Sequence, residues 1–529
     1  MQDLKWWQSG VIYQIYPRSF QDSNGDGIGD LPGIIQRLDY LVTLGVSAIW
    51  ISPIYPSPMA DFGYDVSDFC AVDKVFGNLA DFDELVDEAH SRGLRLILDF
   101  VPNHTSNEHP WFLESRSSRD NPKRDWYIWR DAAAEGTLPN NWLSRFGGPA
   151  WEWDEATKQY YYHSFLKQQP DLNWRNPRVR HAMHDVLRFW LDRGVDGFRV
   201  DVVWLLIKDD QFRDNPINPG YYPGESMHNR LLPLYAADRP EVHEVVAAMR
   251  GVVDAYPDRV LIGEIYLPIE RLVTYYGREL SGVNLPFNFQ LLQTVWNAES
   301  VARIIAEYEE ALPQGAWPNW VLGNHDNPRI VSRIGAAQAR VAAMLLLTLR
   351  GTPTIYYGEE IGMNDVPIAP EQLQDPAEKN EPGLRLGRDP ERTPMPWDGS
   401  LLAGFTSGRP WLPIDTDHAR VNVKALCESR DSILNLYRRL LELRQKNSAL
   451  VQGRIDAVGA EENILRYERR QGEERILILL NLSHEPARVA YPPGRVLLST
   501  YLDRTGEDSG GGAWLRADEG IIVQIELDS

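Results

Sequence analysis

The chain of 529 residues has few cysteines and a shortage of positive charge, and each shortage excludes a class of protein. Its two cysteines, Cys70 and Cys427, lie far apart and outside any CxxC pair, which excludes a disulfide scaffold and a cysteine zinc site. Lys and Arg number 54 against 75 Asp and Glu, so the formal net charge is −21. This charge repels phosphate backbones and anionic lipid, and we expect no nucleic-acid partner.

Long apolar runs and two common hydrolase motifs are also missing. No uninterrupted apolar stretch reaches the roughly 18 residues needed to span a bilayer. The first ten residues, MQDLKWWQSG, contain neither the basic nor the apolar part of a secretory signal, so we expect a cytoplasmic protein with no membrane partner. The sequence has no GxSxG elbow and no GxxxxGK[ST] loop, which argues against serine-hydrolase and nucleotide-hydrolase chemistry.

Short β-like runs alternate with helical stretches through much of the chain. The stretches 31–45 and 79–93 have apolar residues at three-and-four spacing and end at glycine. Eight runs are predicted to be strands: 11–17, 47–53, 94–102, 197–202, 259–265, 285–289, 319–326 and 352–360. This pattern predicts an α/β fold with a (β/α)₈ TIM barrel, and a doubly wound open sheet is the alternative.

The spacing of the runs indicates three domains. Residues 104–171, between strands three and four, are rich in Trp, Tyr, Asn, Pro and Gly and predict an inserted domain. The barrel then comprises residues 1–103 and 172–450, with a mobile or ligand-covering excursion at about 361–425. From residue 451 to residue 529 the pattern changes to short strands, which predicts a C-terminal antiparallel β-domain.

The acidic loop DSNGDGIGD has the spacing of a cation-binding loop. Positions 1, 3, 5, 7 and 9 of an EF-hand-like loop fall on Asp22, Asn24, Asp26, the carbonyl of Ile28, and Asp30. Gly33 stands at position 12, where a true EF-hand has a bidentate Glu. We expect a structural divalent-cation site, with Ca²⁺ favoured over Mg²⁺, and a solvated acidic turn is the alternative.

Charged residues stand at or just after several predicted strand ends. They are Asp99 and His104 after strand three, Arg199 and Asp201 at strand four, Glu264 at strand five, and His325 and Asp326 at strand seven. The carboxyl ends of barrel strands share one face. Pairs of carboxyl groups at such a face are what glycosidic cleavage requires. Arg199 lies two residues before Asp201, on the same side of the strand, and can keep that carboxylate ionised.

Four segments in this order, DFVPNH (99–104), GFRVD (197–201), GEI (263–265) and GNHD (323–326), resemble the signature segments of the α-amylase superfamily of glycoside hydrolases, glycoside hydrolase family thirteen. The resemblance extends to residues 45–53 and 351–362 and runs from the first strand to about residue 450. QPDLN (169–173) is similar to the variant of the oligo-1,6-glucosidase and α-glucosidase branch. The chain therefore resembles cytoplasmic bacterial α-glucosidases.

The resemblance assigns roles to individual residues. It implies Asp201 as the nucleophile, Glu264 as the general acid/base and Asp326 as the transition-state stabiliser. His104, Arg199 and His325 would line the same sugar subsite, and the family's metal loop matches Asp22, Asn24, Asp26, Ile28 and Asp30. Asp61 would bind the hydroxyls of the terminal glucose, Tyr64 would stack under that sugar, and Arg392 would be the cationic partner of Asp61.

The resemblance implies a retaining, exo-acting α-glucosidase that releases glucose from short α-glucosides such as maltose, isomaltose and small malto-oligosaccharides. No organic cofactor is expected, and the oligomeric state is left open. Val202, directly after the nucleophile, matches neither standard version of the family, so the preferred linkage stays open. The alternatives are transglycosylation by a transglucosylase, a sucrose or trehalose isomerase, or an inactive relative such as the chaperone subunits of transporters. All three acids are present, which argues against the inactive relative.

Overall fold

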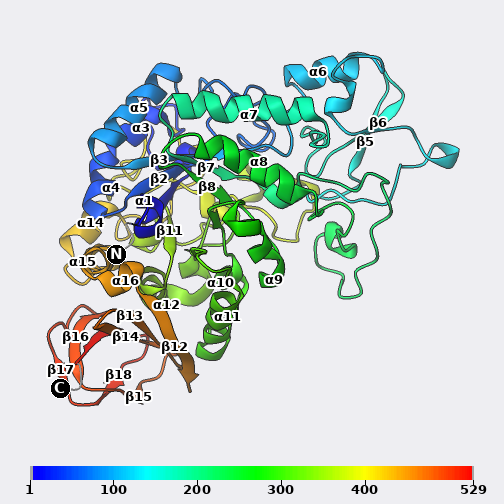
Figure 1. Cartoon of the computed structure of the whole chain (residues 1–529). Coiled ribbons are helices and arrows are strands. Elements are labelled where there is room, and N and C mark those ends of the chain that lie inside the picture. Colours follow the sequence, from blue (N-terminus) through cyan, green and yellow to red (C-terminus); the bar gives the residue numbers. More distant parts are fainter. Residues whose placement is uncertain (1–3, 527–529) are drawn as a thin grey trace.

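The computed structural model describes residues 4–526 and has a parallel β-barrel at its centre (Figure 1). The barrel strands are β1 (Ile12–Ile15), β2 (Ala48–Ile51), β3 (Arg95–Phe100), β7 (Gly197–Val200), β8 (Val260–Gly263), β9 (Leu285–Pro286), β10 (Asn319–Val321) and β11 (Thr352–Tyr356). Their order is β10-β11-β1-β2-β3-β7-β8-β9, and a parallel bridge between Asn288 and Trp320 joins the two edges. The predicted (β/α)₈ barrel is confirmed, and the open doubly wound sheet is excluded.

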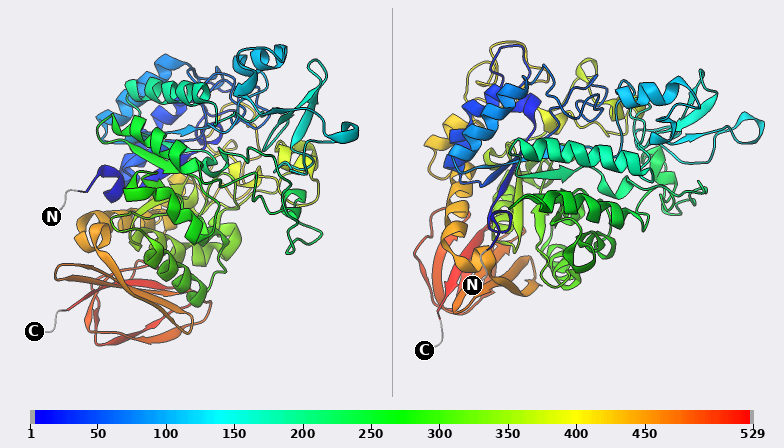
Figure 2. Two further views of the ribbon diagram at one scale, coloured as in Figure 1. Left: turned by 45° about the vertical axis from the view of Figure 1, so that its right-hand side comes forward. Right: turned by 45° about the horizontal axis from the view of Figure 1, so that its top comes forward.

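Amphipathic helices surround the barrel (Figure 2). The longer ones are α5 (Leu79–Ser91), α7 (Pro177–Asp192), α8 (Val242–Asp254), α11 (Ala298–Ala311), α12 (Ile330–Thr348) and α15 (Ile433–Lys446). In α7, Val179, Met183, Val186 and Trp190 are buried at three-and-four spacing, which is how a helix covers a sheet with one face. The helix predicted over 31–45 is divided at Arg37 into α3 (Leu31–Gln36) and α4 (Leu38–Leu44).

Shorter helices fill the connections. They are α1 (Trp6–Ser9), α2 (Pro17–Phe20), α9 (Ile269–Leu272), α10 (Gln290–Gln293), α14 (Val423–Glu428) and α16 (Ser448–Gln452). Helix α4 ends at Gly45, whose φ of 100° is the left-handed conformation that glycine adopts readily. Both cysteines are free, with Cys70 half-buried and Cys427 exposed.

Helix α12 is long and apolar enough to cross a membrane by length and composition, and it is the one such helix among residues 4–526. Its backbone is interrupted at Gly335, and its residues from Val341 to Thr348 are buried. Arg340 in this helix donates to the carbonyl of Thr500 in the C-terminal domain. Helix α12 is therefore packed between the barrel and the C-terminal domain as part of the core.

The segment between β3 and β7 forms a lobe that projects from the barrel (Figure 1). It contains α6 (Pro110–Ser117) and a three-stranded antiparallel sheet in the order β4-β6-β5, from β4 (Trp129–Arg130), β5 (Trp151–Asp154) and β6 (Gln159–Tyr162). Buried aromatic rings, among them Trp142, Trp151 and Tyr162, form a core of its own. In the excursion after β11, α13 (Pro376–Asn380) contacts this lobe, because Asn380 donates to the carbonyl of Phe146 at 3.0 Å.

The C-terminal strands form a six-stranded antiparallel sheet, β12-β13-β14-β19-β16-β17, and a two-stranded sheet, β15-β18. Their bounds are β12 (Arg454–Glu461), β13 (Ile464–Gln471), β14 (Glu474–Asn481), β15 (Ala487–Ala490), β16 (Gly494–Ser499), β17 (Asp508–Ser509), β18 (Gly512–Leu515) and β19 (Gly520–Ile525). Two buried arginines lie where this domain meets the barrel. Arg444 donates to the carbonyls of Leu347, Leu349 and Gly351, and Arg469 to those of Thr348 and Gly453.

Candidate active site

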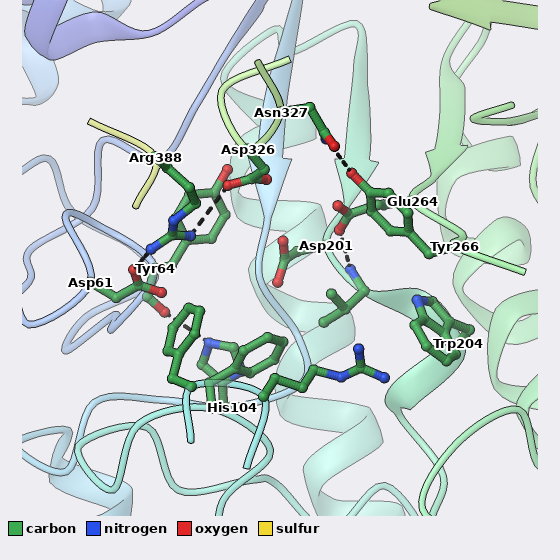
Figure 3. Close-up of a pocket in the computed structure, with 14 residues that line it drawn as sticks. Asp61, Tyr64, His104, Asp201, Trp204, Glu264, Tyr266, Asp326, Asn327 and Arg388 are labelled. Carbon is green, nitrogen blue, oxygen red and sulfur yellow. Dashed lines mark hydrogen bonds and ion pairs between the residues drawn. The ribbon is translucent and has the colours of Figure 1, made fainter. Parts of the chain in front are cut away.

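A cavity of about 320 Å³ opens at the carboxyl ends of the barrel strands (Figure 3). Its lining comes from the barrel, the inserted lobe and the excursion after β11: Asp61, Tyr64, His104, Arg145, Phe146, Phe165, Asp201, Val202, Trp204, Glu264, Tyr266, Asp326, Asn327 and Arg388. Six predicted site residues are among them, namely Asp61, Tyr64, His104, Asp201, Glu264 and Asp326. The volume is at the small end of the range for ligand pockets and suits a mono- or disaccharide.

One guanidinium holds three carboxyl groups beneath the cavity. Arg199, which is 1% exposed, donates from Nη1 to Asp99 at 2.7 Å and to Asp201 at 2.8 Å. Its Nη2 lies 2.8 Å from Oε2 of Glu264. Residues 199 and 201 point to the same side because side chains alternate along β7. The predicted contact between Arg199 and Asp201 is confirmed, although Arg199 supports the cavity from below and does not line it.

The charges in this cluster do not balance. Burial raises the pKa of Asp201 and of Glu264, and it raises the pKa of Asp99 to about 6. A single cation cannot neutralise three buried carboxylates, so the cluster keeps a proton near neutral pH. Asp201 and Glu264 contact different nitrogens of the same guanidinium, Nη1 and Nη2 of Arg199, at 2.8 Å each. The site therefore brings two carboxyl groups, both with raised pKa values, against one guanidinium.

The backbone at Val202 is strained. Its φ of 36° and ψ of 43° lie in the left-handed region, where a β-branched residue is an outlier. The Val202 amide donates to Oε2 of Glu264 at 2.8 Å. The strained conformation thus fixes the orientation of the Glu264 carboxyl group relative to Asp201.

Asp326, on the opposite wall, stays ionised. Its Oδ1 accepts from Arg392 at 2.8 Å and from Arg388 at 3.2 Å, and its Oδ2 lies 3.3 Å from Nε2 of His325. Burial alone would raise the pKa of Asp326, but the guanidinium groups of Arg388 and Arg392 hold it well below its usual range. Asp326 therefore presents a negative charge to the cavity.

Asp61 and Arg388 close one end of the cavity, away from Glu264 and Tyr266 (Figure 3). Arg388 donates to Oδ1 of Asp61 at 2.7 Å and to Asp375 at 2.6 Å. Gln169 donates to the other oxygen of Asp61 at 3.1 Å. Asp61 is buried and Arg388 is half-buried, and the pair forms a polar wall at this end.

The prediction that Arg392 is the cationic partner of Asp61 is wrong. Arg392 is fully buried under the cavity, where it donates to the carbonyl of His325 at 2.6 Å and to Asp326. Arg388, four residues earlier in the chain, donates to Asp61 instead. The motif RDPER contains both arginines, but which of them faces the cavity depends on how the excursion folds.

Two predicted residues, Tyr64 and His325, form a stacked pair. Their rings are 5.4 Å apart and nearly parallel, and the Tyr64 hydroxyl and His325 Nε2 are hydrogen-bonded at 2.6 Å. Burial lowers the pKa of His325 well below its usual value, so the imidazole is neutral. His325 does not line the cavity, whereas His104 does and is hydrogen-bonded to the carbonyl of Tyr64 at 2.9 Å.

Sequence reasoning missed the residues that other segments bring to the cavity. They are Arg145, Phe146 and Phe165 from the inserted lobe, Trp204 after β7, Tyr266 after β8, Asn327 after β10, and Arg388. Gln169, within the matched segment QPDLN, also belongs to the site through its hydrogen bond to Asp61. Trp204, Tyr266 and Asn327 lie one to three residues after the predicted acids Asp201, Glu264 and Asp326, and this proximity is the one signal that could have indicated them.

The acidic loop 22–30 is held by its own hydrogen bonds. Asp22 accepts from the amides of Asn24, Gly25 and Gly27 at 2.8–2.9 Å, and Asp30 accepts from the amide of Gly33 and caps α3. Within residues 4–526, no three His, Cys, Asp or Glu side chains converge on a point where a metal could sit. Amide and carbonyl oxygens of Asn24 and Ile28 are needed to complete a ligand set, so the cation site stays a prediction.

Comparisons with known proteins agree with this geometry. The family profile described as alpha amylase, catalytic domain, matches residues 14–453. A probable alpha-glucosidase of Rhizobium meliloti is 44% identical over 93% of this chain and 92% of its own length. An oligo-1,6-glucosidase of Parageobacillus thermoglucosidasius is 40% identical over 94% of this chain and 95% of its own.

Solved structures with this fold include an alpha-glucosyl transfer enzyme and an isomaltulose synthase. The alpha-glucosyl transfer enzyme XgtA superimposes with a TM-score of 0.94 and 42% identity over 99% of this chain and all of its own. The isomaltulose synthase SmuA of Protaminobacter rubrum gives a TM-score of 0.91 and 36% identity over the same shares.

Proposed function

The chain belongs to the α-amylase family of glycoside hydrolases, and from this premise we propose that it is a retaining, exo-acting α-glucosidase. Its substrates are short α-glucosides, such as maltose, isomaltose and small malto-oligosaccharides. Asp201 is the nucleophile, Glu264 the general acid/base and Asp326 the stabiliser of the transition state.

The observation that carries the proposal is the closed end of the cavity. The ion pair between Asp61 and Arg388, with Gln169 behind it, gives a charged wall suited to sugar hydroxyls. A glucose unit held there cannot continue into a further sugar at that end. Asp326 lies next to this wall, and Asp201 and then Glu264 follow farther along the cavity (Figure 3), so cleavage releases one terminal glucose at a time.

The first chemical step forms a covalent intermediate. The Asp201 carboxylate attacks the anomeric carbon of the terminal glucose, and the bond to the leaving oxygen breaks. Glu264, whose pKa burial raises, gives its proton to that oxygen. Asp326, held as a carboxylate by Arg388 and Arg392, stabilises the positive charge that develops on the sugar ring.

The second step reverses the first one. Glu264, now ionised, takes a proton from an incoming hydroxyl, whose oxygen attacks the anomeric carbon and displaces Asp201. Water as the incoming group gives hydrolysis, and a sugar gives transfer. Transglucosylation or isomerisation is the second candidate function, supported by the close superposition on XgtA and SmuA.

Product analysis tests the proposal. We expect glucose from maltose and isomaltose, and stepwise shortening of maltohexaose by one unit. Early release of maltose or maltotriose from maltohexaose would contradict exo action. Conversion of sucrose into an isomer without free glucose and fructose would favour the second candidate.

A further inference from the structure

Arg145, from the inserted lobe, differs from the other arginines around the cavity. Arg199, Arg388 and Arg392 are each paired with carboxylates. In the described part of the chain, the guanidinium of Arg145 makes no hydrogen bond and no ion pair. Its backbone amide donates to the carbonyl of Ser164 at 2.9 Å. The guanidinium packs over the ring of Trp204, with Cζ 4.6 Å from the ring centroid. Among the described residues, no carboxylate is paired with Arg145, although its side chain lines the catalytic cavity.

Trp204 places this cation on the leaving-group side of the reacting bond. Asp61 and Arg388 lie on one side of Asp201, whereas Glu264, Tyr266 and Trp204 lie on the other (Figure 3). The inference rests on the proposed function, in which Glu264 protonates the leaving oxygen. The leaving group then extends toward Trp204, and Arg145 is the charged group that it meets there.

Space for a leaving group continues beyond Trp204. A second cavity, of about 220 Å³, shares Arg145 and Trp204 with the catalytic cavity. Its other polar lining residues include Asn215, His228 and Asn229. Arg145 therefore stands between the reacting bond and a further chamber, where an aglycone or an acceptor can lie.

The electrostatics of the region favour an anionic group next to Arg145. Desolvation lowers the pKa of Arg145, which means that burial of its unpaired charge is unfavourable. A bound carboxylate or phosphate would supply the missing counter-charge, and the planar guanidinium can bind such groups through two parallel hydrogen bonds. The other charged groups that line the cavity include four acids, Asp61, Asp201, Glu264 and Asp326, so without Arg145 an anionic aglycone would be repelled.

We propose that Arg145 and Trp204 form a leaving-group subsite for aglycones that carry a carboxylate or a phosphate. The Trp204 ring supplies an apolar face for the body of the aglycone, and Arg145 binds its anionic group. The substrate class of the enzyme then includes α-glucosides of anionic alcohols and phenols, and the same groups act as acceptors in transfer.

A matched pair of substrates tests this subsite. 4-Carboxyphenyl and 4-carbamoylphenyl α-glucosides have nearly the same shape and differ in charge, and a 4-phosphonophenyl glucoside separates phosphate from carboxylate preference. Arg145→Gln should lower kcat/KM for the carboxyphenyl glucoside roughly 10- to 100-fold and for the carbamoylphenyl glucoside by less than about 3-fold, as expected for loss of a charge-assisted hydrogen bond. Arg145→Lys should retain part of the preference.

The control variant is Arg130→Gln, which changes an exposed arginine of the same lobe and should alter neither rate. Equal losses on the two phenyl glucosides in Arg145→Gln, or no loss on either, would overturn the inference while leaving the α-glucosidase assignment intact. Activity on the carbamoylphenyl glucoside shows that the variant is folded. If the wild type hydrolyses neither maltose nor any aryl α-glucoside, the proposed function fails, and the inference fails with it.

Discussion

At the scale of single residues, the site depends on how one buried cation is shared. Arg199 contacts Asp99, Asp201 and Glu264, and the strained amide of Val202 holds the Glu264 carboxyl group in place. Asp201 and Glu264, the two acids predicted at strand ends, therefore differ in their surroundings, because only Glu264 also accepts from the Val202 amide. In the proposed mechanism, Glu264 gives a proton from this cluster to the leaving oxygen.

The substitution Glu264→Gln tests whether Glu264 is the general acid. The amide cannot protonate a leaving oxygen, so hydrolysis of maltose should fall by about 10²- to 10⁴-fold, the usual contribution of general acid catalysis. An aryl glucoside with an acidic phenol, such as 2,4-dinitrophenyl α-glucoside, needs no protonation and should lose far less in its glycosylation rate. Equal losses on both substrates would show that Glu264 is not the acid.

The pH profile gives a second test of Glu264. Burial raises its pKa, and the protonated form is the active one, so wild-type kcat/KM on maltose should fall as the pH rises through that pKa. The alkaline decline should be absent for 2,4-dinitrophenyl α-glucoside in Glu264→Gln. If the alkaline decline persists in Glu264→Gln, the group that titrates is not Glu264.

Arg388→Ala should damage recognition of the terminal glucose. It removes the partner of Asp61 and one partner of Asp326, and a lost charge-assisted hydrogen bond costs about 1.5–3 kcal/mol. Because maltose and isomaltose present the same terminal glucose, kcat/KM for both should fall by a similar factor. Arg385→Ala, three residues earlier at an exposed position outside the cavity lining, is the control. A change in the ratio of the two substrates would contradict the role in terminal-glucose binding.

At the scale of elements, the strands were predictable and the loops were not. The strand in 94–102 is encoded by a local apolar run that is buried on both faces, and the charged residues after β7 and β8 follow from the direction of parallel strands. The division of the 31–45 helix at Arg37, and the choice of Arg388 over Arg392, depend on contacts between segments far apart in the sequence. Short-range patterns contain no information on those contacts.

The acidic loop 22–30 offers a prediction at this scale. If it binds Ca²⁺, added Ca²⁺ should raise the melting temperature of the wild type by mass action, since the ion binds the folded state. Asp26→Ala should remove that rise, with little change in rate per folded molecule, whereas Asp120→Ala, at an exposed acid of the inserted lobe, should keep it. An equal Ca²⁺ effect in the wild type and in Asp26→Ala would exclude the loop as the site.

At the scale of the whole molecule, stability and catalysis are located at opposite ends of the barrel. Arg469 joins the C-terminal domain to the end of α12, and Arg444 of α15 joins the same end of α12 to Gly351, just before β11 begins. The acids and the inserted lobe lie at the carboxyl ends of the strands. Changes at the first end should therefore affect unfolding and leave the chemistry intact.

Arg444→Met tests this separation. The substitution leaves three buried carbonyls without their donor, and each unsatisfied group costs about 1–3 kcal/mol. We expect the free energy of unfolding to fall by roughly 3 kcal/mol, with kcat on maltose nearly unchanged below the unfolding transition. Arg439→Met, on the exposed face of the same helix, should leave the denaturant midpoint close to that of the wild type. A large loss of kcat in folded Arg444→Met would contradict the separation.

The most direct test of the account is the configuration of the glucose that is released first. Asp201 and Glu264 share the guanidinium of Arg199 at 2.8 Å each. With Asp201 as the nucleophile, the proposed reaction takes two displacements and keeps the configuration, whereas a single-displacement enzyme places a water between carboxyl groups about 6.5–9.5 Å apart. Hydrolysis of 4-nitrophenyl α-glucoside, followed by proton NMR before mutarotation, should therefore show α-glucose first, and Asp201→Asn should show no release. Initial β-glucose would mean a single displacement and would contradict the roles of both carboxyl groups.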